Sequence, residues 1–101
     1  MFISLPLSNI LKFTISFDLE YAVIYDKRFY IGKLLENCSD GMCKMKFLHQ
    51  RGAEVFKWPL RDDIDTVHRS TVFFGPLQLS GADPFTIPCL KDIQEAYKQL
   101  L

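Results

Sequence analysis

The chain has 101 residues, 49% of them hydrophobic and 14% aromatic, and its 12 Lys plus Arg residues balance its 12 Asp plus Glu residues. This length fits one domain, and so much apolar surface excludes wholesale disorder. A free-standing nucleic-acid binder usually carries a clear basic excess. Zero net charge therefore argues against DNA or RNA as the main partner.

The first 19 residues read as an arm that precedes the folded domain. They lack a basic start, a continuous apolar core and a small-residue cleavage site, so we expect no secretory signal. Lys12 and Asp18 interrupt any membrane span, which needs roughly 20 apolar residues, and no membrane partner is expected. Apolar and polar residues alternate over Lys12–Phe17, which predicts an extra, half-buried strand in this arm.

Two strands joined by a short turn are predicted next. Tyr21–Tyr25 is rich in β-branched and aromatic residues, and the polar stretch Asp26–Arg28 suits a hairpin turn. Phe29–Glu36 forms the second strand, in which Gly32 marks a sharp bend or a close backbone approach. The stretch Asn37–Gly41 ends in Asp-Gly, which supplies the positive φ angles of a tight turn.

Met42–Leu48 is the third predicted strand. Its odd-numbered residues share an apolar face and its lysines share a face that must meet water. These residues are Cys43, Met45 and Phe47 on one side and Lys44 and Lys46 on the other. His49–Ala53 is expected to be a turn around a glycine.

Two more strands complete the predicted sheet. The fourth is Glu54–Trp58, whose two aromatic residues are expected to be buried; it is stopped by Pro59, which has no N–H for a ladder. Arg61–Asp65 is interpreted as a polar turn. The fifth strand is Thr66–Phe74, ended by the Gly-Pro pair at residues 75–76.

A loop and one helix follow, over residues 77–101. Phe85–Ile87 is predicted to be a short edge strand. Leu90–Leu101 has helical apolar spacing, with acidic residues early and a lysine late, as the helix dipole favours. Its apolar face either covers one mouth of the domain or meets a partner or second copy. That face consists of Leu90, Ile93, Tyr97, Leu100 and Leu101.

Five short strands in about 55 residues predict a mostly β fold. We expect a small, five-stranded SH3-like barrel at residues 20–76, with the loop and C-terminal α-helix of residues 77–101 packed on it. Residues 1–19 form the arm with its extra strand.

A family resemblance supports this expectation. The run AVIYDKRFYIGKLLE is similar to the opening hairpin of Tudor-like domains, and MKFLHQRG resembles their third strand. The fuller pattern YIGK, MKFLHQRG, FKWP and DDIDTV resembles a C-terminal tail module of animal proteins derived from transposable elements. The resemblance covers about residues 21–75 and implies a Tudor-like barrel, a place in chromatin, and an intracellular location in which the nucleus is favoured over the cytoplasm.

The same resemblance implies a ligand. Tudor-like domains typically surround a methylated Lys or Arg with aromatic rings whose faces attract the cation. The matching positions are Tyr25, Tyr30 and Phe47, with Asp26 as the nearest acidic partner. A fourth aromatic of methyl-arginine readers falls near Gln50, which departs from the pattern. The alternative is that the three rings serve the core or its edge.

Catalytic, metal and cofactor sites are not predicted. Cys38, Cys43 and Cys89 are an odd number at irregular spacing, which suits reduced thiols in an intracellular protein. His49 and His68 are not spaced as a ligand pair. The acidic cluster Asp62, Asp63 and Asp65 lacks the spacing of a calcium loop and is interpreted as a solvated turn.

The functional hypothesis is therefore a non-catalytic binding module for a protein or peptide partner. Two alternatives stay open. The arm and the helix form a homodimer or scaffold surface, or Lys44, Lys46 and Lys57 line a nucleic-acid-binding face, which a salt-dependence series tests.

Overall fold

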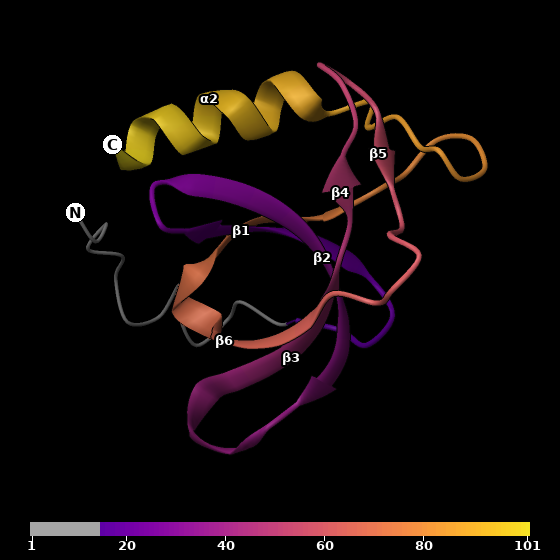
Figure 1. Cartoon of the computed structure of the whole chain (residues 1–101). Coiled ribbons are helices and arrows are strands. Elements are labelled where there is room, and N and C mark those ends of the chain that lie inside the picture. The colour runs from indigo at the N-terminus through magenta and orange to yellow at the C-terminus, as the bar shows by residue number, and fades with distance from the viewer. Residues whose placement is uncertain (1–14) are drawn as a thin grey trace.

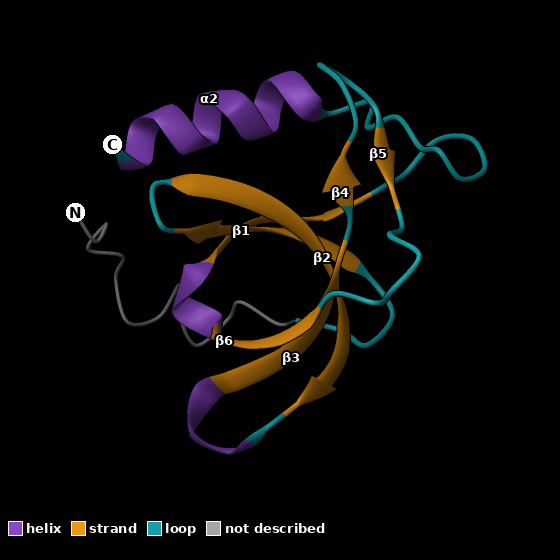
Figure 2. Ribbon diagram, viewed as in Figure 1, coloured by secondary structure: helices purple, strands orange, loops and turns teal. Residues whose placement is uncertain are grey.

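The structure is a computed structural model and describes residues 15–101. Its main sheet has five antiparallel strands in the order β6-β3-β2-β1-β7 (Figure 1). These strands are β1 (Glu20–Tyr25), β2 (Arg28–Asn37), β3 (Met42–Phe47), β6 (Ile64–His68) and β7 (Val72–Leu77). A small second sheet pairs β4 (His49–Gln50) with β5 (Phe56–Lys57), and the C-terminal helix is α2 (Leu90–Leu100). The mostly β fold with a C-terminal helix is confirmed (Figure 2).

The sheet must curl, because a short turn joins its two edge strands and so brings the two edges close to each other. β6 and β7 lie at opposite ends of the strand order, yet only the 3₁₀ turn η2 (Arg69–Thr71) separates them in the chain. Among residues 15–101, no strand pairing joins β6 to β7. The main sheet is therefore open along this seam, rather than the closed five-stranded barrel that we expected.

Both predicted tight turns are found. Asp26 and Lys27 connect β1 to β2 and both have positive φ angles, 50° and 62°. Such paired positive values match the right-handed twist of a hairpin. Between β2 and β3, Asp40 and Gly41 have φ angles of 61° and 75° within the 3₁₀ turn η1 (Ser39–Gly41).

The region after β3 differs from the prediction. His49 and Gln50 form β4 instead of a turn, and the expected strand Glu54–Trp58 is reduced to the two residues of β5. The Arg51 N–H donates to the Val55 carbonyl at 2.7 Å, so the reversal occupies residues 51–55. β5 ends at Lys57 because the Trp58 N–H donates to the Asp83 side chain at 3.3 Å. The expected edge strand Phe85–Ile87 is replaced by two isolated bridges.

The predicted single strand Thr66–Phe74 is wrong, because β6 and β7 divide it. Polar side chains stabilise the break. The His68 ring accepts a hydrogen bond from the Ser70 N–H at 3.1 Å, and the Thr71 hydroxyl donates to the His68 carbonyl at 2.6 Å. These bonds satisfy main-chain groups that a continued strand would place in a ladder.

Gly75 and Pro76 do not end the strand; they lie within β7 as an irregularity in its pairing with β1. Gly75 has a φ of 136°, and a Cβ there would lie 2.6 Å from a ring carbon of Tyr21. Only glycine therefore allows Tyr21 to lie so close to this part of β7.

Strands β1, β2 and β7 of the curled sheet are buried on both faces, because their residues enter two separate cores. The core inside the curl contains Ile15, Tyr21, Val23, Leu34, Cys43, Met45, Phe47 and Val72. The core on the outer face contains Ala22, Ile31, Leu48, Phe56, Leu77, Ile87, Leu90 and Ile93. The predicted inward face of β3 is confirmed, since all three of its apolar residues belong to the first core.

Helix α2 packs across the outer face of the sheet (Figure 1). Its Leu90 and Ile93 are buried in the second core, beside residues of β1, β2 and β7. Farther along the helix, the Tyr97 ring lies 5.4 Å from that of Phe29, and its hydroxyl donates to the Lys27 carbonyl. The helix thus holds the β1–β2 turn from outside.

The arm is described only in part. Residues 12–14 of the expected strand Lys12–Phe17 lie outside the described residues, and residues 15–17 are not in a strand. Ile15 is nevertheless buried in the first core, and the Ser16 N–H donates to the Tyr21 hydroxyl at 2.8 Å. Within residues 15–101, no helix combines the length and the apolar character that a bilayer crossing needs.

Candidate functional site: an aromatic pocket with an acidic side

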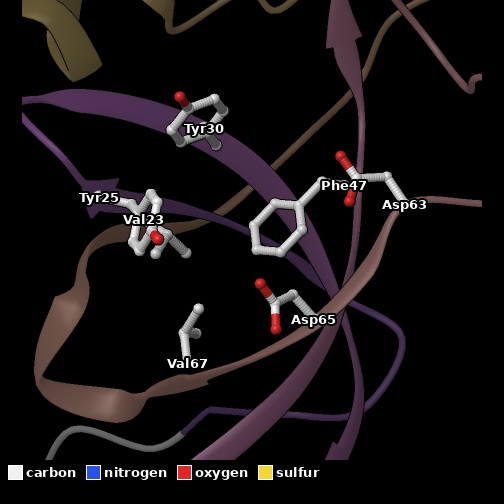
Figure 3. Close-up of a pocket in the computed structure, with 7 residues that line it drawn as sticks. All are labelled: Val23, Tyr25, Tyr30, Phe47, Asp63, Asp65 and Val67. Carbon is white, nitrogen blue, oxygen red and sulfur yellow. The ribbon is translucent and has the colours of Figure 1, made fainter.

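A pocket of about 230 Å³ opens between the β1–β2 hairpin and the β6 edge (Figure 3). Three aromatic rings, two valines and two carboxylates line it, and all come from strands or strand ends of the main sheet. They are Val23, Tyr25, Tyr30, Phe47, Asp63, Asp65 and Val67. Pockets that bind drug-sized ligands measure about 300–1,000 Å³, so this smaller pocket suits the end of one side chain.

Strand alternation brings these side chains together. Val23 and Tyr25 are two residues apart on β1, and Tyr30 on β2 pairs directly with Val23. Residues two apart on a strand point to the same face, as do directly opposed residues on neighbouring strands. Phe47, at the end of β3, pairs with Gly32 of β2.

Gly32 makes room for the Phe47 ring. A Cβ at residue 32 would lie 2.8 Å from Phe47 Cε1 and 3.2 Å from Met45 Sδ. The first distance is far below ordinary van der Waals contact. The close approach at this mid-strand glycine is made by the side chains of Phe47 and Met45 rather than by another stretch of backbone, and it leaves room for one wall of the pocket.

The three rings form a tilted series. Tyr25 and Tyr30 have ring centroids 6.4 Å apart at 59°, and Tyr30 and Phe47 have centroids 6.4 Å apart at 76°. Phe47 is 8% exposed and Tyr25 is 62% exposed, with Tyr30 between them. The series therefore runs from a buried floor to an open rim, with ring surface left free at the rim.

Two carboxylates face the rings from β6 and the residue before it (Figure 3). Asp63 Oδ2 lies 2.8 Å from His49 Nε2, and Asp65 Oδ1 accepts the Thr66 N–H at 2.8 Å. Among the described residues, the ion pairs of Lys33 and Lys46 go to other acids, at Asp18, Glu20 and Asp62. The pocket thus combines aromatic rings with two carboxylates, of which Asp63 already pairs with His49 and Asp65 does not, and this lining suits a cation that carries alkyl groups.

Sequence reasoning found the aromatic half of this pocket and missed the acidic half. Tyr25, Tyr30 and Phe47 lie together at the pocket, whereas Asp26 is an exposed turn residue that does not line it. At the position of the absent fourth aromatic, the Gln50 side-chain amide donates to the Ala53 carbonyl, away from the pocket lining. Asp26 therefore does not reach the pocket, whose acidic lining consists of Asp63 and Asp65, residues that the sequence pattern assigns to a solvated turn.

The missed signal is a period of two. Asp63, Asp65 and Val67 alternate with Ile64 and Thr66, which is the pattern of a strand that begins before Thr66. A predicted start at Thr66 places both aspartates outside the strand and therefore outside the sheet. The structure instead begins β6 at Ile64, so that Asp63, Asp65 and Val67 reach the pocket together.

A second aromatic surface lies around Trp58. Phe56 is buried as predicted, but Trp58 is only half-buried. Lys33 and Lys46 place their ammonium groups 5.4 Å and 4.8 Å from the centroid of its ring. Because Lys46 also pairs with Asp62 at 3.4 Å, its charge is already engaged by this chain.

Burial disfavours the reactive thiolate form at two of the three cysteines. All three are free, and burial raises the pKa of the thiols of Cys43 and Cys89. A raised pKa leaves less of the nucleophilic thiolate at neutral pH. Within residues 15–101, no three His, Cys, Asp or Glu side chains are grouped so as to hold a metal ion.

Comparison with models of protein families, with curated proteins and with solved structures gave no match.

Proposed function

We propose that this chain is a non-catalytic binding module that recognises a methylated Lys or Arg side chain of a protein partner, in the setting of chromatin. The observation that supports the proposal is the joint lining of one pocket by Tyr25, Tyr30 and Phe47 with the carboxylates of Asp63 and Asp65. The finer fold that we propose is Tudor-like, because the curled sheet has consecutive strands at its two edges.

The physical basis is the match between the lining and an alkylated cation. Methyl groups on a Lys or Arg side chain reduce its hydration and leave its positive charge. The ring faces attract that charge by about 0.5–2 kcal/mol each, depending on how dry the site is. The carboxylates add charge attraction that purely apolar packing of the rings would not need.

The alternative role for these rings is core packing. Phe47 fits it in part, since it is buried inside the curl. Tyr25 does not, because a ring that is 62% exposed contributes little to a core. Its exposed position at the pocket rim supports the proposed contact with a ligand.

The test is a titration followed by NMR at Tyr25 and Tyr30. The ligands are otherwise identical short peptides with trimethyl-lysine, dimethyl-lysine, dimethyl-arginine or unmodified lysine. We expect a methylated peptide to bind with a Kd of about tens of micromolar and to bind more tightly than the peptide with unmodified lysine. An equal response to all four peptides, or no response to any, would eliminate recognition by the aromatic pocket.

A matched pair of variants separates the pocket from exposed aromatics in general. Tyr25→Leu removes a ring at the pocket rim, and we expect binding of the preferred methylated peptide to weaken by about two- to thirty-fold. Phe17→Leu removes another exposed ring, which is 68% exposed and does not line the pocket. It should leave affinity unchanged; equal losses in both variants would contradict the proposal.

Homodimerisation stays the second candidate, favoured by the exposure of Phe17 and Leu19 at the end of the arm. Light scattering over a concentration series tests it. A strict monomer at high concentration would remove it.

A further inference from the structure

The outer edge of β6 has main-chain groups that point away from the sheet. The Phe47 N–H donates to the Asp63 carbonyl at 2.8 Å, and β3 and β6 pair in a continuous antiparallel register. In such a ladder, alternate residues direct both main-chain groups to the partner strand. Asp63, Asp65 and Val67 therefore face β3, and Ile64 and Thr66 face outward.

Other hydrogen bonds agree with this assignment. The Thr66 N–H is taken by the side chain of Asp65, which would be impossible if it pointed into the β3–β6 ladder. The His68 carbonyl accepts from the Thr71 hydroxyl, as an outward group is free to do. Among the described residues, Ile64 and Thr66 make no main-chain hydrogen bond to a neighbouring strand on this side.

This open edge adjoins the aromatic pocket. β6 is the strand whose Asp65 and Val67 side chains line it, while Ile64, on the opposite face of the strand, is 44% exposed. A strand added beside β6 would bury Ile64 on one face and lie next to the pocket on the other. Recognition by strand addition combines main-chain hydrogen bonds with pockets for alternate side chains.

We propose that the partner is an extended peptide that adds to β6 as an antiparallel strand and places its cationic side chain beside Asp65, in the pocket. This inference rests on the proposed function and deepens it by specifying how the peptide backbone is held. Residues that flank the cationic residue pair with Ile64 and Thr66 and supply the main-chain hydrogen bonds. In this exchange the Thr66 N–H leaves the Asp65 carboxylate, to which it donates in the free protein, and donates to a peptide carbonyl instead. The cationic residue lies opposite Asp65 without main-chain bonds to it, where side chains approach most closely.

Charge selects this occupant over a second copy of the chain. Pairing β6 with β6 of another copy would gather Asp62, Asp63 and Asp65 of both molecules along one short edge. Like charges directly opposed across strands are destabilising, and charged side chains on an edge prevent self-pairing. A cationic peptide meets the same edge with complementary charge.

The first test compares a peptide with its isolated side chain. The probes are N-acetyl-dimethyl-lysine methylamide and a heptapeptide of alternating Thr and Val with dimethyl-lysine at its centre. We expect the heptapeptide to bind about tenfold more tightly or better, because only it can pair along β6. N-methylation of the amides that flank dimethyl-lysine should abolish this gain, whereas N-methylation of the dimethyl-lysine amide itself should not.

The second test blocks the edge of the protein. Thr66→Pro removes the outward N–H while leaving the β3–β6 bonds, and proline is tolerated on edge strands. Thr66→Val is the matched control, which keeps the N–H and the side-chain shape. Thr66→Pro should remove the advantage of the heptapeptide over the capped residue when both are measured on this variant, whereas Thr66→Val should keep it.

The outcomes separate the two proposals. Equal affinity for the capped residue and the heptapeptide, with no effect of flanking N-methylation, would overturn strand addition and leave the pocket proposal standing. Absence of binding by either probe would overturn both. If Thr66→Pro does not fold, the N-methylated peptides decide the question on the unaltered protein. Concentration-dependent dimerisation abolished by Thr66→Pro would assign the edge to self-pairing and overturn the proposal.

Discussion

At the level of single residues, Gly32 shows how the side chain of a neighbouring strand can dictate which residue type a strand position accepts. Glycine within a strand normally weakens it, and alanine at a compatible site stabilises by about 0.4–1 kcal/mol. At Gly32 we expect alanine to destabilise the protein instead, because the new methyl group would meet the Phe47 ring. Gly32→Ala should lower the free energy of unfolding by about 1–3 kcal/mol in urea titrations.

The cause can be isolated with a double-mutant cycle. Phe47→Leu shortens the opposing side chain, so adding Gly32→Ala in that background should cost much less than it does in the wild-type chain. We expect a coupling of about 0.5–3 kcal/mol between the two sites. Strictly additive effects would show that the Phe47 ring does not limit residue 32.

Glu20 makes stability depend on pH. Burial raises the pKa of its carboxyl, Lys33 at 3.9 Å lowers it, and nearby Asp18 raises it, with a net upward direction. An acid with a raised pKa holds its proton more tightly in the folded protein than in the unfolded chain. Its contribution to stability is therefore present at low pH and is lost as pH rises from about 4.5 through the folded pKa.

The check is urea unfolding of wild type and Glu20→Gln across this range. Glutamine cannot ionise, so the difference in unfolding free energy between the two proteins should move in favour of Glu20→Gln as pH rises. A difference that is flat with pH would contradict the raised pKa.

At the level of elements, helix α2 depends on one buried side chain. Ile93 is fully enclosed in the second core, so Ile93→Ala should lower the free energy of unfolding by about 2–5 kcal/mol. Gln94→Ala, at the exposed neighbouring position, should change it by less than about 0.5 kcal/mol. Chemical denaturation measures both. Equal stability of the two variants would mean that the helix presents Ile93 to a partner instead.

Local chemistry decided which elements could be predicted. The two turns were accessible because Asp-Lys and Asp-Gly carry their own backbone preferences, and β3 was accessible because its burial alternates strictly. The break at η2 could not be predicted from the sequence, since it depends on hydrogen bonds of His68 and Thr71 that no periodicity reveals. β4 was hidden in a turn-like sequence because its pairing with β5 is a tertiary contact.

At the level of the whole molecule, the sequence favoured a mostly β domain but not its second core. Strands such as β1 carry apolar residues on both faces, with Tyr21 and Val23 in one core and Ala22 in the other. A run of this kind predicts a strand without saying what covers its second face. The acidic side of the pocket was missed for a related reason, because β6 reaches the rings only once the sheet curls.

The joining of consecutive strands at opposite edges also has a consequence for the order in which the chain folds. The pairings of β1 with β2 and of β2 with β3 connect segments that follow one another, whereas β7 must return to β1 from about fifty residues away in sequence. Contacts between distant segments form slowly, because the intervening chain must first be ordered. During synthesis the first strands can therefore pair while β7 and α2 are still absent, and the outer core assembles last.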